Sequence, residues 1–221
     1  MTIALLSIPP LEQHQSRRAT WQDYQALRDQ AEWRKIAFHL GWLWADMGKE
    51  GRNHARFSDL MTMLFGFWVF LHPEMTLESF GRCLIEKPET QAAAPDLVLY
   101  KGDNIPQWQP GEARKIDLTV HRLPDLVGEV SDTTLSLDLD EQKQLYASLG
   151  IPEYWVIDVV GLRLFAFGLN EMGLYEEIET SRCFPGLAIA LVSQTIARLS
   201  QETSTAAANW FMRQLQGYGD D

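Results

Sequence analysis

Apolar residues along this chain either recur at helical spacing or form short runs, and each pattern predicts a different kind of element. A spacing of three to four residues places side chains on one face of an α-helix, and it runs through residues 19–38 and residues 57–71. The second run is followed by His72-Pro73, which predicts the end of that helix. Between the two predicted helices, the segment "GWLW" at residues 41–44 predicts a short strand.

Short apolar runs predict several strands in the middle of the chain, because loops rich in Pro, Gly and Asn separate them. These strands are expected at residues 79–86, 96–100, 115–120 and 125–130. Residues 1–18 show no clear periodicity and are expected to be loose.

The clearest helix signal lies at residues 138–150. Asp138 is expected to cap this helix with Glu141 three residues later, and Gly150 predicts its end. Apolar runs flank the helix, since the strand at residues 125–130 precedes it and "EYWVIDVV" and "LRLFAF" follow it. A strand, a helix and a second strand in this order predict a crossover connection, and therefore a sheet that is parallel in part.

The last part of the chain predicts an edge strand at residues 175–178 and two helices. Helical spacing joins Ile189, Val192, Ile196 and Leu199. Residues 203–205 offer caps for a final helix. The predicted class is mixed α/β, with one central sheet and helices packed on it. The length fits a single domain over residues 1–221, with a core at about residues 20–200 and a C-terminal helical extension.

Composition narrows the cellular setting. The chain is 46% hydrophobic and is long enough to bury a core. Its most apolar run, residues 60–71, is shorter than the roughly 20 residues that a membrane span needs, and the N-terminus lacks the charged start of a signal peptide. Cys83 and Cys183 give neither a disulfide framework nor a zinc-ligand spacing. A cytoplasmic protein without a membrane segment is expected.

The net charge of −11 is unevenly distributed along the chain. Residues 1–60 hold 8 basic and 7 acidic residues, whereas residues 61–221 hold 11 basic and 23 acidic residues. An acidic surface repels the backbone of nucleic acids, so broad phosphate contact is disfavoured unless a local basic patch or a metal ion overcomes the repulsion. The basic cluster "KEGRNHAR" at residues 49–56 is explained as readily by a solvated loop.

Candidate chemistry centres on two copies of Pro-Asp-Leu-Val, at residues 95–98 and 124–127. Asp96 opens the first strand. In the second strand Asp125 and Glu129 share one face, and a glutamate among apolar neighbours is costly to bury unless it is paired or binds a cation. Two carboxylates from neighbouring strands repel each other and favour a hard cation such as Mg²⁺ between them.

A structural pair explains the same residues without a metal ion. Asp96 is then a turn residue after Pro95, and Glu129 is bridged to an arginine such as Arg122. The residue pattern alone leaves both interpretations open.

A lysine close to two such carboxylates would stabilise charge on a phosphate or help to position a water molecule. The helix after Glu129 offers two positions for it. Gln142 lies near the middle of the apolar face, and Lys143 lies at its edge, from which a long stem can reach the sheet. From the residues alone, a solvated surface lysine is the simpler explanation of Lys143, but Lys143 is the residue predicted as the catalytic lysine.

The run from Pro95-Asp96 through "PDLVGEVSDTTLSLDLDEQKQLYASLGIPEYWVID" closely resembles the Uma-two family of bacterial proteins, a group of candidate endonucleases with a restriction-endonuclease-like fold. The resemblance covers residues 90–165 well and residues 20–89 loosely. It implies a central mixed sheet flanked by helices and a PD-(D/E)xK site, in which Asp96 and Glu129 bind Mg²⁺ or Mn²⁺. It also implies hydrolysis of DNA.

The sequence departs from the pattern of that family at three positions. Ser131 stands where a lysine is expected two residues after the glutamate. Gln142 stands where the family places a lysine on the following helix. His39-Leu40-Gly41 replaces a segment that commonly reads acidic-Asp-Gly. His54 precedes the apolar helix, as a histidine often does in the family, and is a candidate auxiliary residue; an exposed histidine in a basic loop is the simpler explanation.

Three functions follow as hypotheses. The first is a metal-dependent endonuclease acting on DNA. The second is a catalytically degenerate relative that binds nucleic acid or protein, and the third is a phosphodiesterase for a small phosphorylated metabolite. The sequence leaves the oligomeric state open; a homodimer is one hypothesis, since the apolar "GIPEYWVIDVVGLRLFAF" could extend a sheet across a two-fold axis.

Overall fold

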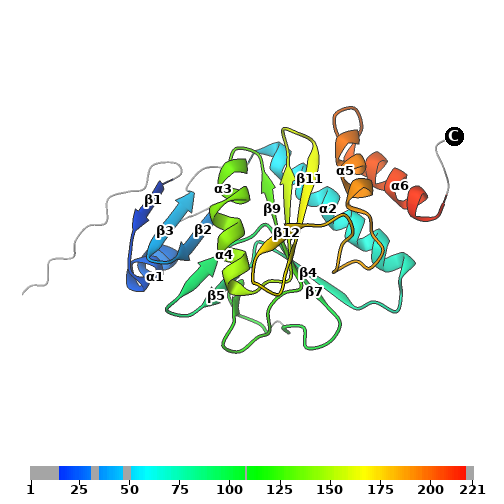
Figure 1. Cartoon of the computed structure of the whole chain (residues 1–221). Coiled ribbons are helices and arrows are strands. Elements are labelled where there is room, and N and C mark those ends of the chain that lie inside the picture. The colour runs from blue at the N-terminus through cyan, green and yellow to red at the C-terminus, as the bar shows by residue number, and fades with distance from the viewer. Residues whose placement is uncertain (1–14, 31–34, 47–50, 108, 218–221) are drawn as a thin grey trace, which may run out of the picture.

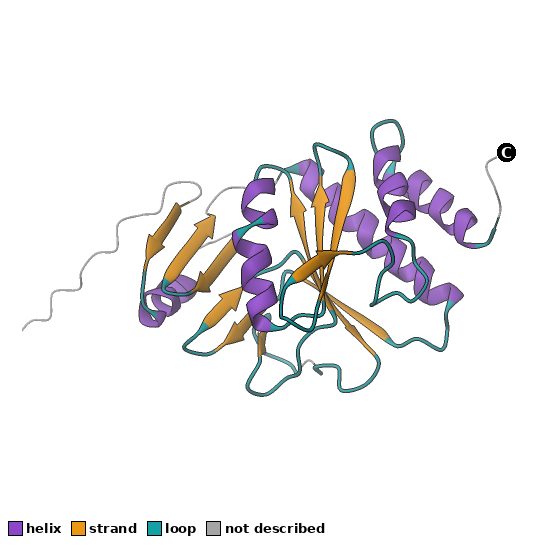
Figure 2. Cartoon of the chain, viewed as in Figure 1, coloured by secondary structure: helices purple, strands orange, loops and turns teal. Residues whose placement is uncertain are grey.

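The computed structural model of the protein describes residues 15–30, 35–46, 51–107 and 109–217. These residues form two six-stranded mixed sheets and the helices that cover them (Figures 1 and 2). In order across the first sheet, the strands are β1 (Gln15–Arg18), β3 (Trp42–Asp46), β2 (Lys35–His39), β6 (Gln91–Ala93), β5 (Leu84–Lys87) and β8 (Lys115–Asp117). In order across the second sheet, they are β12 (Tyr175–Glu177), β11 (Arg163–Leu169), β10 (Glu153–Asp158), β9 (Leu126–Ser131), β7 (Leu97–Lys101) and β4 (Leu77–Gly81). The helices are α1 (Trp21–Gln30), α2 (Arg52–Leu71), α3 (Leu135–Leu139), α4 (Glu141–Leu149), α5 (Ile189–Arg198) and α6 (Ser204–Leu215).

Helices cover both faces of the second sheet. On one face α2, α5 and α6 pack over the inward side chains of Leu126, Val130 and Trp155. On the other face α4 packs over Val127 and Tyr154, which alternate along the strands with the first set. Figure 1 shows α3 and α4 standing between the strands of the first sheet and β9–β11. Residues of β9 that point toward α4 therefore also face the first sheet.

The crossover around α4 agrees with the prediction. Strands β9 and β10 are parallel, with Glu129 opposite Val156, and the helical segment between them ends at Gly150 in a left-handed conformation with φ of 86°. The start of this segment differs from the prediction. Asp138 does not cap a helix, because it lies inside the short helix α3 with its side chain fully buried.

The helix predicted over residues 19–38 is confirmed in its first part and wrong in its last part. Helix α1 ends at Gln30, and Lys35–His39 forms strand β2, which pairs with β3 on one side and with β6 on the other. The turn between β2 and β3 is Leu40-Gly41, and both residues have positive φ, as the tight turn of a two-residue hairpin requires. Ile36 and Phe38 are buried against Trp21 and Tyr24 of α1, so tertiary packing overrides the local helical spacing.

Two further expectations need correction. Residues 79–86 form two strands, because the chain turns at Arg82, which has φ of 53°; β4 then belongs to the second sheet and β5 to the first. The single central sheet that was predicted is therefore a pair of sheets. Residues 15–18 of the segment expected to be loose form β1, and residues 1–14 lie outside the described residues.

Other predicted elements are confirmed with small shifts in their boundaries. Strand β3 contains Trp42, Leu43 and Trp44 of "GWLW", α2 starts at Arg52 and ends before His72, and β12 is an edge strand. The Thr203 side chain accepts a hydrogen bond from the Ala206 N–H and so caps α6. Trp210 and Phe211 of α6 are buried in the core that α2 shares, so this helix packs against the body of the domain.

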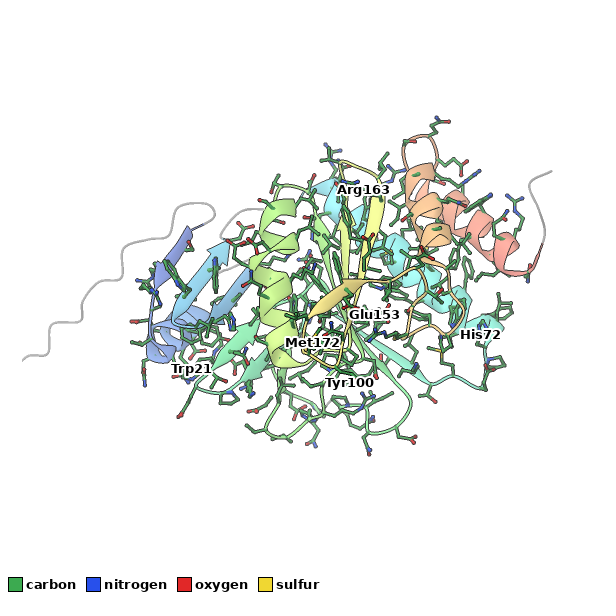
Figure 3. The ribbon with its side chains drawn as sticks, in the orientation of Figure 1. Trp21, His72, Tyr100, Glu153, Arg163 and Met172 are labelled. Carbon is green, nitrogen blue, oxygen red and sulfur yellow. The ribbon has the colours of Figure 1, made fainter. Side chains whose placement is uncertain are left out.

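The apolar strands β10 and β11 lie inside the second sheet, with neighbours on both sides. They cannot extend the sheet into a second copy, so the homodimer stays a prediction without that route. Glu153 of β10, labelled in Figure 3, is buried and accepts hydrogen bonds from Trp155 Nε1 at 2.6 Å and from the N–H of Cys183 at 2.7 Å. Among the described residues, no helix combines the length and the apolar character that a membrane span requires.

Candidate active site

Asp96 and Glu129 come together on neighbouring strands. Asp96 directly precedes β7, and Glu129 lies in β9, which pairs antiparallel with β7 and places Leu97 opposite Gly128. The Val130 N–H donates a hydrogen bond to Asp96 Oδ2 at 2.8 Å, and the Asp96 N–H donates to Glu129 Oε2 at 3.4 Å. Both carboxylates are buried, with 7% of Asp96 and 1% of Glu129 exposed. The paired strands thus bring the two carboxylates side by side, as the motif predicted.

The cation between these carboxylates is the ammonium group of Lys35. Its Nζ lies 2.6 Å from Glu129 Oε2 and 3.2 Å from Asp96 Oδ2. Lys35 belongs to β2 of the first sheet, so its side chain bridges the two sheets. Sequence reasoning missed this residue because Lys35 stood inside the helix predicted over residues 19–38. The signal that would have found it is the pair of strands joined by Leu40-Gly41, which makes Lys35 the first residue of a strand.

Two further side chains orient the carboxylates. Tyr146 of α4 donates its hydroxyl hydrogen to Glu129 Oε1 at 2.6 Å, which leaves Oε2 for the ammonium group. His54, in the first turn of α2, places Nε2 3.1 Å from Asp96 Oδ2. Only 3% of the His54 side chain is exposed, so the explanation of this histidine as an exposed loop residue is wrong.

A third carboxylate, that of Asp138, stands close to the same ammonium group. Its Oδ2 accepts hydrogen bonds from Ser131 Oγ at 2.7 Å and Thr134 Oγ1 at 2.6 Å. Its Oδ1 lies 3.8 Å from Lys35 Nζ and is a buried atom without a hydrogen-bond partner. Ser131, which stands where a lysine is expected, therefore holds Asp138 in place.

The pKa values reflect three carboxylates around one lysine. Burial alone lowers the pKa of Lys35, but the charges of Asp96, Glu129 and Asp138 outweigh it and keep the ammonium group protonated. Burial also raises the pKa of Asp96, yet Lys35 and His54 reverse that effect and hold it well below its usual range. Burial raises the pKa of Glu129 to about 8, with Asp96 and Asp138 adding to the rise and Lys35 opposing it. The Lys35 ammonium group alone does not balance three carboxylates, and the raised pKa of Glu129 reflects this imbalance.

A cavity of about 500 Å³ opens beside the cluster. Lys35 and Glu129 line it together with Gln142 of α4. Gln142 is 6% exposed, and its Oε1 is buried without a hydrogen-bond partner.

The remaining wall of the cavity is rich in acidic and small polar groups. The acidic residues of the lining, apart from Glu129, are Asp46, Asp140 and Glu141. The cavity has space for a small ligand, but its charge disfavours an anion unless a cation accompanies that anion.

Lys143 lies outside this cluster. Its Nζ lies 3.8 Å from the centroid of the Phe167 ring, in a cation–π contact, and burial lowers its pKa. Among the contacts of the described residues, none places Lys143 beside Asp96 or Glu129, so its catalytic role stays a prediction. Arg122 pairs with Asp125 at 2.8 Å, so the bridge to Glu129 considered for the structural alternative is made by Lys35 instead.

The residues present fit a divalent cation with few protein ligands. Within the described parts of the chain, no group of three or more His, Cys, Asp or Glu side chains is placed to hold a metal ion. Mg²⁺ often binds through only one or two carboxylates and keeps several waters. Asp138 Oδ1 has no hydrogen-bond partner, and its distance of 3.8 Å from Lys35 Nζ is long for an ion pair. Together with the raised pKa of Glu129, this indicates that the cluster can take up additional positive charge.

Comparison with known families decides the relationship of the chain. The model of a family described as "Uma2: Putative restriction endonuclease" matches residues 21–204. The chain belongs to this family. The match includes β2 with Lys35, the strands with Asp96 and Glu129, and α4 with Gln142.

A solved structure supports the fold of this Uma2 protein. The crystal structure of a putative nuclease belonging to DUF820 from Anabaena variabilis aligns with a TM-score of 0.50 and 14% sequence identity. The alignment covers 87% of this chain and 98% of the other. At this identity the likeness concerns the fold alone. A search of curated proteins found no match.

Proposed function

We propose that this Uma2 protein is a divalent-metal-dependent endonuclease that hydrolyses phosphodiester bonds in DNA. The observation that carries the proposal is the convergence of Asp96 and Glu129, from paired strands, on one cation beside a cavity. Membership of a family described as restriction endonucleases supports the same class of reaction.

Asp96 and Glu129 would hold a Mg²⁺ or Mn²⁺ ion. When bound, such an ion polarises a phosphoryl oxygen and lowers the pKa of a coordinated water. The chain itself holds the two carboxylates ready for a cation: Val130 N–H and His54 fix Asp96, and the Tyr146 hydroxyl fixes Glu129. Because these contacts already orient the two carboxylates, the carboxylates themselves need little reorganisation to hold a cation.

The reaction itself is a displacement at phosphorus. The oxygen of a water molecule forms a bond to phosphorus, and one phosphorus–oxygen ester bond breaks. The attacking water loses a proton and the leaving oxygen takes one up, so the products are a phosphate monoester and a free hydroxyl group. Positive charge beside the phosphate stabilises the charge that develops on its oxygens.

The acidic wall of the cavity makes binding of DNA dependent on cations. Asp46, Asp140 and Glu141 repel a phosphate group that approaches the cavity. We expect weak binding without a divalent ion and stronger binding with one.

A catalytically degenerate relative is the second candidate function. The observation that favours it is the ion pair of 2.6 Å between Lys35 and Glu129, which neutralises part of the cluster without any metal ion. In that case the site keeps its shape through Lys35, and the protein acts by binding alone.

Cleavage assays with matched variants separate these candidates. Plasmid DNA and single-stranded DNA are incubated with millimolar Mg²⁺ or Mn²⁺, and bis-p-nitrophenyl phosphate serves as a small substrate. The wild type should cleave DNA, and Asp96→Asn should abolish cleavage. The control is Asp125→Asn in the other Pro-Asp pair, because Asp125 pairs with Arg122 and lies outside the site.

Each alternative has its own outcome. Cleavage of the small diester without cleavage of DNA would transfer the proposal to a small phosphorylated substrate. Loss of DNA cleavage in Asp125→Asn as well as in Asp96→Asn, with both variants folded, would remove the assignment of the site. Purified wild type that cleaves nothing with either ion would favour the degenerate relative.

A further inference from the structure

We infer that the Lys35 ammonium group and a divalent ion compete for Asp96 and Glu129. When the ion displaces the ammonium group, that group stabilises the negative charge on the phosphate of the substrate. The inference rests on the proposed function for its last step only. Its first step, competition for two carboxylates, concerns binding and is testable without any cleavage.

The position of Lys35 carries the first step. Its Nζ contacts one oxygen of each carboxylate, at 2.6 Å and 3.2 Å, so the ammonium group occupies the place between Asp96 and Glu129, the residues that would hold a divalent ion. Two cations cannot occupy this place at once, so a divalent ion has to displace the ammonium group. Lys35 also lines the cavity, and 14% of its side chain is exposed, so the displaced group has open space beside it.

Among the described residues, Lys35 alone brings a lysine or arginine side chain to these carboxylates. In the part of the chain that the structure describes, Lys35 is the only lysine or arginine in an ion pair with Asp96 or Glu129. Lys143 makes a cation–π contact with Phe167, and Ser131, which stands where a lysine is expected, binds Asp138. The positive charge beside a bound phosphate would therefore come from Lys35 on β2 of the first sheet.

Gln142 of α4 lines the same cavity as Lys35 of β2. It lies on α4, lines the cavity with Lys35 and Glu129, and keeps a buried Oε1 without a hydrogen-bond partner. A lysine at position 142 would project into the space that Lys35 enters from β2. The two positions should therefore be exchangeable: Lys35→Gln removes the charge, and Gln142→Lys in that background returns it from the other wall.

The experiment measures Mg²⁺ affinity by titration calorimetry and DNA cleavage on the same proteins. Lys35→Gln should bind Mg²⁺ about tenfold more tightly than the wild type, because the competing ammonium group is gone. The same variant should cleave DNA about 10²-fold more slowly, because a positioned positive charge is lost. Lys35→Gln/Gln142→Lys should regain at least a tenth of the wild-type rate. If Lys35 had a purely structural role, Lys35→Gln would leave the Mg²⁺ affinity unchanged.

Two controls keep the test sharp. Lys115→Gln removes another lysine that lies 3.3 Å from a buried glutamate, Glu86, and should change neither readout. Lys35→Arg keeps the charge and should keep the Mg²⁺ affinity within about threefold of the wild type. If Lys35→Gln does not fold, Gln142→Lys still reports on competition, since a second ammonium group in the cavity should weaken Mg²⁺ binding.

The outcomes distinguish this inference from the proposed function. Lys35→Gln with unchanged Mg²⁺ affinity, or with cleavage at the wild-type rate, overturns the inference and leaves the nuclease proposal standing. A wild type without cleavage, combined with tighter Mg²⁺ binding in Lys35→Gln, overturns the nuclease proposal and supports the competition.

Discussion

Glu86 and Glu129 are two buried glutamates with nearly the same immediate partners. Glu86 lies on β5 of the first sheet and Glu129 on β9 of the second, and 2% and 1% of them are exposed. Each accepts a hydrogen bond of 2.6 Å from a tyrosine hydroxyl, from Tyr24 and Tyr146 respectively. Each also has a cationic nitrogen at 2.6 Å, which belongs to Arg28 for Glu86 and to Lys35 for Glu129.

The two clusters differ in their balance of charge. Glu86 has a second cation, Lys115 at 3.3 Å, while Arg28 is shared with the exposed Asp29. Glu129 shares its single lysine with Asp96 and Asp138, and it lines a cavity. A buried carboxylate with sufficient cations is a structural ion pair. A surplus of carboxylates beside a cavity is the arrangement that the proposed function requires, and of these two clusters the one at Glu129 has it.

The largest expected difference between the clusters is in activity. Glu129→Gln should lower DNA cleavage by about 10³-fold, because it removes a charge that acts directly on the reacting cation. Glu86→Gln should leave the rate per folded molecule unchanged and lower the free energy of unfolding by about 2 kcal/mol, because Arg28 and Lys115 lose their charged partner. Cleavage rates and urea unfolding of both variants measure the two effects. Equal loss of cleavage in both variants would show that the clusters do not differ in function.

The two tyrosines provide a smaller test of the same comparison. Tyr24→Phe and Tyr146→Phe each delete one hydroxyl that binds a buried glutamate, and each should cost about 1–2 kcal/mol of stability. Only Tyr146→Phe should also slow cleavage, by about tenfold, because it loosens Glu129. Weaker Mg²⁺ binding in Tyr146→Phe but not in Tyr24→Phe would identify Tyr146 as a positioning residue. If Tyr24→Phe slows cleavage as much as Tyr146→Phe does, the Tyr146 hydroxyl affects cleavage only through the stability of the fold.

A pH series tests the charge imbalance around Glu129. Burial raises the pKa of this carboxyl from its ordinary value of 4.5 to about 8. Between these values the folded protein holds a proton that the unfolded chain lacks, so the stability contributed by Glu129 falls as the pH rises through this window and is constant above it. The melting temperature of the metal-free wild type, relative to Glu129→Gln, should therefore decrease by a few degrees from about pH 5 to about pH 8. A difference that does not change with pH would contradict the imbalance.

The smallest effect is expected at Lys143, outside both clusters. Lys143→Ala removes a cation–π contact with Phe167 and should lower the stability by about 0.5–1 kcal/mol. The cleavage rate should stay within about twofold of the wild type, because the observed contact of Lys143 is with Phe167, outside the carboxylate cluster. Initial cleavage rates at saturating Mg²⁺ provide the measurement. A loss of about 10²-fold would return the catalytic role to Lys143, as the sequence predicted.

The sequence by itself determined the parts of this protein that depend on near neighbours in the chain. The end of α4 follows from Gly150, which adopts a left-handed conformation that glycine tolerates. The parallel pairing of β9 and β10 follows from the length of the segment between them. The two Pro-Asp-Leu-Val strands predict a paired or cation-binding site at Asp96 and Glu129, since a carboxylate beside apolar strand residues requires a partner.

The tertiary structure alone decided which partner those carboxylates have. Lys35 is remote from both in sequence and reaches them only because β2 pairs with β6, which leads directly through Pro95 to Asp96. The local spacing of residues 19–38 favours a helix, and burial of Ile36 and Phe38 against α1 overrides it. Local propensities are weak compared with the apolar surface that a strand buries between two neighbours, so a sequence pattern cannot show a contact that long-range pairing creates.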